Sequence, residues 1–190
     1  MNRLDVTGEL VEQIDWHWRS QLRPRLEGLS DEEYFWEPVA GAWNVRPRTC
    51  SSAETLWGTG EWTIDFVYPP PEPAPVTTIA WRLSHVLVGV LGARIAGHFG
   101  GEPCDYGSYD YPGTAGEALR RLDALYERWL EGVRSWRGDA LAAPVGDAEP
   151  PQYADAPRAT LVLHINRELI HHGAEIALLR DLYAHRPLVG

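Results

Sequence analysis

Cysteine and basic side chains are both scarce in this chain of 190 residues, and each scarcity excludes a class of protein. The two cysteines, Cys50 and Cys104, fit neither a CxxC motif nor a zinc-finger spacing, so we expect reduced thiols that bind no metal. The 17 basic residues are outnumbered by 27 acidic ones, which gives a formal net charge of -10. Because the basic residues are scattered singly, this charge pattern disfavours a nucleic-acid or anionic-membrane partner.

Targeting and membrane signals are also missing at the level of the sequence. The N-terminus, Met1–Asp5, lacks the basic start and apolar run of a signal peptide, and no apolar stretch reaches the about 18 residues of a membrane span. We therefore expect a cytoplasmic protein. A composition of 44% hydrophobic and 23% charged residues is that of a soluble globular protein, and no Ser/Gly-rich linker divides the chain. A single domain over residues 1–190 is the expected organisation.

Apolar residues at helical spacing predict four long helices. The first should end or kink at Pro24, and the second, which is apolar nearly all round, should be the most buried. A Thr114–Glu117 capping box opens the third helix, whereas Pro157 should lie in the first turn of the fourth, with Asp155 as its cap. The predicted helices cover about residues 7–23, 78–99, 114–136 and 157–184.

The segments between these helices are predicted to be mostly irregular. Ser30–Glu33 is a capping box that should open a short helix before Pro38, and residues 38–76 contain only a weak strand-like run, Trp62–Val67. A loop of that length usually carries function or covers a site. Four helices with apolar stripes predict an all-α four-helix bundle. The connection over residues 100–113 could carry a crossover, which would give an up-down-down-up topology.

Two polar residues interrupt the apolar stripe of the fourth helix. Glu168 and His172 are one turn apart, and on a helical wheel they lie on the face formed by Leu161, Ile165, Ile176 and Leu179. The spacing alone is weak evidence, because 16 glutamates and 7 histidines produce such a pair by chance. The position is more informative, since an unpaired charge in a core is costly. The pair must therefore be hydrogen-bonded to each other or bound to a metal ion.

A metal site needs a further ligand from another helix, and His85 in the apolar second helix is the natural candidate. The alternative for His85 is a core histidine hydrogen-bonded to a carbonyl. His164 lies about 12 Å from His172 along the helix, too far for both to bind one ion. His171 and Glu175 form a competing pair near the same face, which we interpret as a supporting or salt-bridged rim.

Glycines and tryptophans near His85 add two further expectations. Gly89 and Gly92 lie four and seven residues after His85, where a missing side chain lets a neighbour approach; we favour helix packing over a ligand pocket. Trp43 and Trp81 could form the wall of a pocket, although packing is the reading that we favour for both.

Three groups of motifs carry a resemblance to a known family: Asp31–Pro38 with Gly41–Arg46, Thr78–His85, and Glu168–Gly173 through Leu178–Arg180. Through them the chain resembles the DinB-like superfamily, which consists of four-helix bundles with divalent-metal sites and includes the mycothiol-dependent maleylpyruvate isomerase. The resemblance implies a histidine on the second helix, and an acid or histidine four residues before a histidine on the fourth. These roles fall on His85 and on Glu168 with His172. If His171 were the histidine of this pair, the position four residues before it would be Arg167, which cannot bind a metal ion, so the pair Glu168 and His172 is favoured.

The resemblance also implies a function. It suggests a homodimeric metal-dependent enzyme that acts on a small molecule, as a thiol-dependent S-transferase or else as an isomerase or hydrolase. Two imidazoles and a carboxylate suit zinc, with nickel, iron and manganese as alternatives, and a low-molecular-weight thiol such as mycothiol would be the co-substrate. A non-catalytic small-molecule-binding or stress-response protein is the alternative function. DNA binding is a weaker one, because the chain is acidic. The catalytic groups beyond the metal, the thiol and the electrophile are not identified by the sequence.

Overall fold

The structure is a computed structural model and describes residues 4–50 and 57–187. Helices make up most of this part of the chain, and the only regular strands within it form one short pair, so the all-α prediction is confirmed.

The first helix passes through Pro24 instead of ending there. α1 (Val6–His17) continues as a π-helical segment (Trp18–Leu22) and then as the short α2 (Arg23–Arg25). In a regular α-helix a proline ring collides with the carbonyl four residues earlier, and the wider π-helical turns before Pro24 relieve that collision. The predicted break is therefore a change of helical winding, and the helix ends only after Arg25.

The second helix is continuous from Ile79 to Phe99 and is the apolar centre of the fold. It comprises α4 (Ile79–His85), a π-helical segment (Val86–Gly92) and α5 (Ala93–Phe99). The Thr78 side chain caps its start by accepting from the Trp81 N–H, and Gly100 ends it at a positive φ of 76°.

This helix corrects the expectation that no stretch is long enough to span a membrane. Ile79–Phe99 is long and apolar enough by length and composition. However, 67% of its most apolar window is buried inside the protein, which is typical of a core helix in a soluble protein.

The third and fourth helices have nearly the predicted bounds. α6 (Ala115–Ser135) is capped by Thr114, whose hydroxyl accepts from the Glu117 N–H. α7 runs from Arg158 to Ala184, so Pro157 precedes the helix instead of lying in its first turn. The prediction of Asp155 as the cap is wrong, because the structure assigns no side-chain cap to the start of α7. A proline at the N-cap fixes the entry of the chain without a capping side chain.

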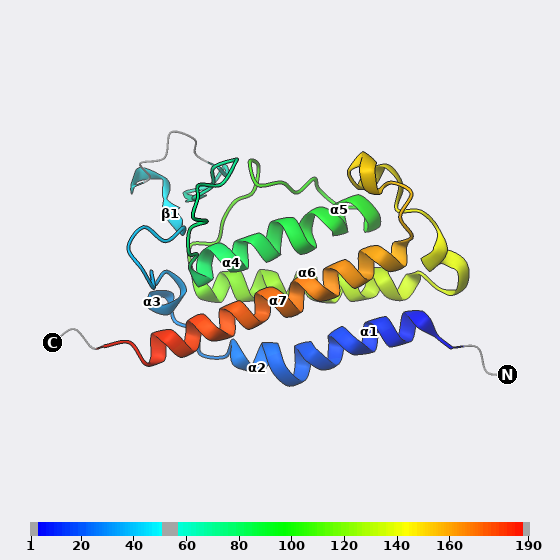
Figure 1. The fold of residues 1–190 in the computed structure, drawn as a ribbon, viewed down its shortest axis with the longest axis horizontal. Helices are drawn as coiled ribbons and strands as arrows, with labels where there is room; N and C mark the ends of the chain where they lie inside the picture. Colours follow the sequence, from blue (N-terminus) through cyan, green and yellow to red (C-terminus); the bar gives the residue numbers. More distant parts are fainter. Residues whose placement is uncertain (1–3, 51–56, 188–190) are drawn as a thin grey trace.

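Each long helix packs against two others. α1 contacts α6 and α7, and the helix formed by α4 and α5 contacts the same two helices. In Figure 1, α1 and α7 run from right to left, whereas the α4–α5 helix and α6 run from left to right. The connection between α5 and α6 returns along the bundle, as a crossover must. These directions fit the up-down-down-up four-helix order, which we keep as our interpretation of the topology.

The long segment before α4 folds against the start of that helix. It follows α3 (Asp31–Tyr34) and contains an antiparallel pair, β1 (Val45–Pro47) and β2 (Trp62–Ile64), so only half of the predicted strand-like run is a strand. The Thr78 hydroxyl donates to Asn44 Oδ1 at 2.8 Å, which ties the loop to the helix cap. The loop is thereby held over the end of the bundle that contains His85.

Both cysteines are free thiols in the described part of the chain, as predicted. Cys50 is exposed, whereas Cys104 is partly buried in the connection between α5 and α6.

Candidate metal centre

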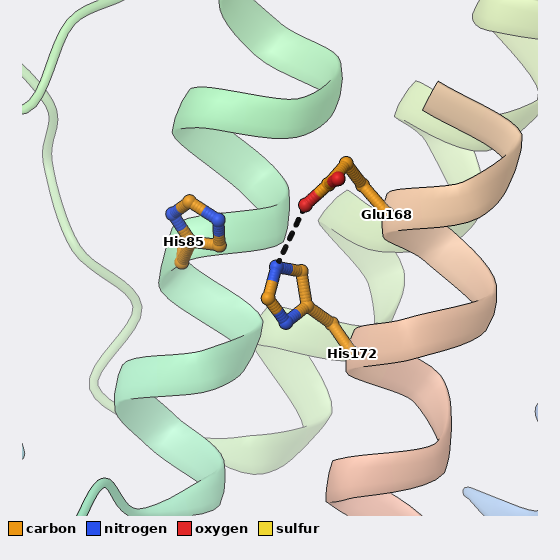
Figure 2. Close-up of side chains that lie close together, drawn as sticks. All are labelled: His85, Glu168 and His172. Carbon is orange, nitrogen blue, oxygen red and sulfur yellow. Dashed lines mark ion pairs between the residues drawn. The ribbon is translucent and has the colours of Figure 1, made fainter. Parts of the chain in front are cut away.

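The three side chains that the sequence singled out converge between α4 and α7. His85, Glu168 and His172 each offer one ligand atom, and these atoms lie within 4.8 Å of one another. The two imidazole rings are perpendicular, with centroids 4.7 Å apart. Figure 2 shows Glu168 and His172 on one helix, both directed at His85 on the facing helix. That this cluster binds a metal ion stays a prediction.

The local sequence explains how α7 delivers two of these groups. Leu161, Ile165 and Ile176 are buried against the neighbouring helices, and they turn His172 inward with them, leaving it 6% exposed. Glu168 differs from the prediction, because its side chain is 23% exposed and lies at the edge of the apolar stripe. The carboxylate is therefore solvated on one side and directed at the imidazoles on the other.

The environment of His85 keeps its imidazole neutral. Burial, together with the nearby His172 and Arg82, lowers its pKa to about 4 against the opposing effect of Glu168 and Glu175. A neutral imidazole has a free nitrogen lone pair, and this is the form that binds metal ions. His85 is thus ready to act as a ligand at neutral pH.

Both histidines use Nδ1 for contacts within the protein. His172 Nδ1 lies 2.7 Å from Glu175 Oε2, and His85 Nδ1 lies 2.5 Å from the Tyr106 hydroxyl. By elimination, Nε2 of each ring is left for the centre of the cluster. Metal-binding histidines usually have this arrangement, with the second ring nitrogen held by a carboxylate, carbonyl or other polar group.

One buried atom supports the metal interpretation directly. Nε2 of His172 is buried and has no hydrogen-bond partner among the residues that the structure describes. Glu168 Oε2 lies 3.4 Å away, close enough for an ion pair but without hydrogen-bond alignment. Because buried nitrogens are normally satisfied, this atom fits a cation held with His85 and Glu168.

The chain matches the family model of the DinB superfamily over residues 13–176. The chain belongs to the DinB superfamily. No curated protein and no solved structure matches it significantly.

The segments that resemble the DinB superfamily meet in this fold at the end of the bundle nearest the C-terminus. Arg180 Nε donates to Glu33 Oε1 at 2.7 Å, which joins α7 to α3. Asn44 Nδ2 donates to the Phe35 carbonyl at 2.9 Å, while its Oδ1 accepts from Thr78. Residues that lie far apart in the sequence therefore hold the C-terminal part of α7 and the start of α4 in place.

Glu175 supports the centre of this DinB-superfamily protein from one side. Arg82 Nε lies 3.0 Å from Glu175 Oε2, the oxygen that also contacts His172 Nδ1. His171 is 63% exposed and lies 3.5 Å from the other oxygen of Glu175. His171, His172 and Glu175 also group as possible ligands, but Glu175 is already paired with Arg82. The structure thus places the pair at the rim, in agreement with our interpretation.

His164 lies one turn before Glu168 and takes part in a separate contact. Its Nδ1 accepts from Arg167 at 2.6 Å, with Glu168 Oε1 3.5 Å away. Burial raises the pKa of Glu168, but His164, Arg167 and His172 outweigh it and hold that pKa below its usual value. Glu168 is therefore an anion at neutral pH, as a metal-binding carboxylate must be.

Two adjoining cavities lead to the cluster. One of 440 Å³ is lined by His85, Glu168 and Tyr106 among others, and the second, of 460 Å³, lies between α5, α7 and the connection before α7. Arg94 and His164 line both cavities, which therefore adjoin at these two side chains, and together we call them the trough. A trough of this size accommodates a small molecule.

Trp43 and Trp81 pack against other aromatic rings and do not form a pocket wall in the described residues. Trp81 stacks on His85 with ring centroids 5.8 Å apart, and Trp43 lies 5.8 Å from Trp81. The described lining of the 440 Å³ cavity includes neither tryptophan. They form an aromatic layer behind His85, which excludes water from that side of the imidazole.

Sequence reasoning missed Tyr106, the contact of His85. Its signal was present, because Gly89 and Gly92 indicated that something approaches this helix closely. The approaching element is the connection between α5 and α6 and not a neighbouring helix: a side chain at Gly89 would meet Tyr106, and one at Gly92 would meet Cys104.

Proposed function

We propose that this protein is a divalent-metal-dependent enzyme acting on a small molecule, with His85, Glu168 and His172 as the metal ligands. A thiol-dependent S-transferase is the leading form of this proposal, and an isomerase or hydrolase is the alternative form. The observation that carries it is the buried Nε2 of His172, which faces Glu168 and His85 without a hydrogen-bond partner in the described residues.

The donor set indicates a catalytic ion. Two imidazoles and one carboxylate leave coordination positions open, as in catalytic zinc sites and unlike closed structural ones. Zinc suits these ligands best, and nickel, iron and manganese are alternatives. When bound, such an ion lowers the pKa of a coordinated thiol or water and so supplies a nucleophile near neutral pH.

Residues of the chain would hold the ion, orient the small molecule and exclude water. His85 and His172 would hold the ion through their ring nitrogens, and the Glu168 carboxylate would reduce the net charge that is buried. Arg94 and His164 line the trough that would orient the small molecule toward the ligands. Trp81 covers the far side of His85 and keeps water from that face of the ring.

Metal content and chelator sensitivity test this proposal together. Protein purified without a metal-affinity tag should contain about one divalent ion per chain by elemental analysis. Incubation with glutathione or mycothiol and the electrophile 1-chloro-2,4-dinitrobenzene should consume thiol. A chelator should stop the reaction, and added zinc should restore it. A metal-free preparation that takes up no zinc, or a rate that ignores the chelator, would count against the proposal.

A non-catalytic binding protein is the second candidate. It is favoured by the internal contacts of the cluster, because the ion pair of Glu168 with His172 and the contact of His172 with Glu175 hold the side chains together without an ion. In that case ligands would bind in the trough without turnover. The same thiol assay separates the two, since binding alone leaves the thiol concentration unchanged.

The assembly and the location of the protein are further parts of the proposal. The family resemblance leads us to expect a homodimer in the cytoplasm, without a nucleic-acid or membrane partner. Light scattering on the purified protein tests the dimer, and a molar mass equal to the 21.3 kDa of one chain would reject it.

A further inference from the structure

Tyr106 reaches the candidate metal centre from the connection between α5 and α6. Its hydroxyl lies 2.5 Å from His85 Nδ1, and its ring is nearly parallel to the imidazole, with an angle of 13°. Figure 2 shows one ring nitrogen of His85 facing Glu168 and His172, whereas the other is turned away from them. The Tyr106 contact is therefore made on the side opposite the cluster.

The fold is shaped to admit this hydroxyl. A Cβ atom built on Gly89 would lie 2.3 Å from the Tyr106 oxygen, so any side chain at position 89 would displace it. One turn later, Gly92 leaves room for Cys104 in the same way, since a Cβ there would lie 2.6 Å from the sulfur. Two glycines on one helix face thus receive two side chains of the same connection.

Other contacts fix the tyrosine in place. The ring of Phe66 stacks on Tyr106, with centroids 5.7 Å apart and an angle of 11°. The Tyr111 hydroxyl donates to the Tyr106 carbonyl at 2.9 Å. Packing alone would need only the ring, whereas the hydroxyl makes one specific contact, with His85 Nδ1.

That contact has a chemical consequence for His85. A neutral imidazole carries one N–H, and the nitrogen that bears the proton cannot bind a metal ion. If Nδ1 donates to the Tyr106 oxygen, the lone pair of Nε2 is left for the cluster. We propose that Tyr106 is a positioning residue, which holds His85 in the Nδ1-protonated tautomer and orients its Nε2 toward the metal.

This inference rests on the proposed metal site, and Tyr106→Phe tests it because that change removes the hydroxyl and keeps the ring. Zinc affinity, measured by competition with a chromophoric chelator, should fall about tenfold or more, as for other residues that hold metal ligands. Tyr109→Phe is the matched control on the same connection and should bind zinc like the wild type.

A second measurement uses the metal-free protein and does not depend on zinc. Long-range ¹⁵N–¹H NMR of the histidine rings reports which nitrogen carries the proton. His85 should be Nδ1-protonated in the wild type and in Tyr109→Phe, and should shift toward the Nε2-protonated form in Tyr106→Phe. A merely structural role of Tyr106 would not move this tautomer.

The outcomes separate the two proposals. If His85→Ala binds zinc as the wild type does, the metal site itself is wrong. If His85→Ala loses zinc while Tyr106→Phe keeps both the wild-type affinity and the wild-type tautomer, the role of Tyr106 is wrong. Should Tyr106→Phe fold poorly by circular dichroism, Gly89→Ala serves instead, because its methyl group displaces the hydroxyl without removing it. Unchanged affinity and tautomer in Gly89→Ala would equally overturn the inference.

Discussion

Two clusters of histidine and glutamate lie along the same apolar helix, and only one of them has an imidazole nitrogen that is buried without a hydrogen-bond partner among the described residues. Near its start, His85 meets Glu168 and His172 of α7. Near its end, His98 meets Glu149 of the connection before α7, with a side-chain exposure of only 4% and 6% respectively. The residue types are nearly the same, so the contrast between the clusters shows what separates a candidate metal site from a structural ion pair.

The difference lies in how the imidazole nitrogen of each cluster is bonded. In the second cluster, Glu149 Oε1 contacts both His98 Nε2 at 3.0 Å and Arg94 Nε at 3.3 Å, so a permanent cation neutralises the carboxylate. In the first cluster, the nitrogen at the centre, His172 Nε2, has no hydrogen-bond partner in the described residues. The hydrogen bond between His98 and Glu149 closes the second site, whereas the unpartnered Nε2 of His172 leaves the first open to a cation.

Replacing one histidine of each cluster should give the largest difference. His85→Ala should abolish stoichiometric zinc binding, because it removes one of three ligands, and His98→Ala should leave the binding unchanged. Isothermal titration with zinc measures both variants, and circular dichroism confirms that each is folded. Equal zinc binding by the two variants would erase the distinction between the clusters.

Acid should destabilise the metal-free protein through the first cluster. The pKa of His85 is about 4 in the folded chain, against an ordinary value of 6.5. The unfolded chain therefore takes up a proton at a higher pH, and the stabilising contribution of neutral His85 is complete above pH 6.5 and is lost as the pH falls toward 4. The free energy of unfolding should decrease over this window by up to about 3 kcal/mol from this residue.

Urea unfolding in the presence of a chelator, at about pH 7 and about pH 4.5, measures the effect. His85→Gln carries no titrating group at this position and should show a smaller pH dependence than the wild type. An identical dependence in both proteins would mean that His85 is not held neutral by its surroundings.

Glu149→Gln should sharpen the comparison by uncoupling stability from metal binding. The change removes the charge that faces Arg94, whose side chain is 24% exposed. Losing one partner of a buried pair costs several kcal/mol, and the partial exposure of Arg94 reduces this to about 2 kcal/mol. Urea unfolding should detect the loss, while zinc affinity stays at the wild-type value. If zinc affinity falls as well, the second cluster is part of the metal site.

The elements defined by local sequence were the predictable part of this molecule. The cap at Thr114 and the stripe that follows it determine α6 without reference to the rest of the fold. Pro24 was misjudged because π-helical winding depends on how the preceding turns pack. Pro157 was placed one residue too far inside α7, since a proline suits the N-cap and the first turn alike.

The candidate site also has a part that the sequence could predict and a part that it could not. Glu168 and His172 share one helix, so their spacing was informative, and His85 was conspicuous as a polar residue in an apolar helix. The exposure of Glu168 depends on neighbours that no helical wheel contains. Tyr106 comes from an irregular connection, and its approach to His85 depends on tertiary folding. Gly89 indicated only that a close contact exists and not which residue makes it.

The smallest expected effect concerns the support of His172, where a carboxylate takes the place that Tyr106 has beside His85. Glu175 Oε2 lies 2.7 Å from His172 Nδ1 and 3.0 Å from Arg82 Nε, so Glu175→Gln keeps the shape but removes the charge that orients the imidazole. Zinc affinity should fall about tenfold, which corresponds to about 1.4 kcal/mol, because the ligand remains and only its support is weakened. The chelator competition used for Tyr106→Phe measures this change. Complete loss of binding would instead make Glu175 a ligand, and would move the centre toward the group formed by His171, His172 and Glu175.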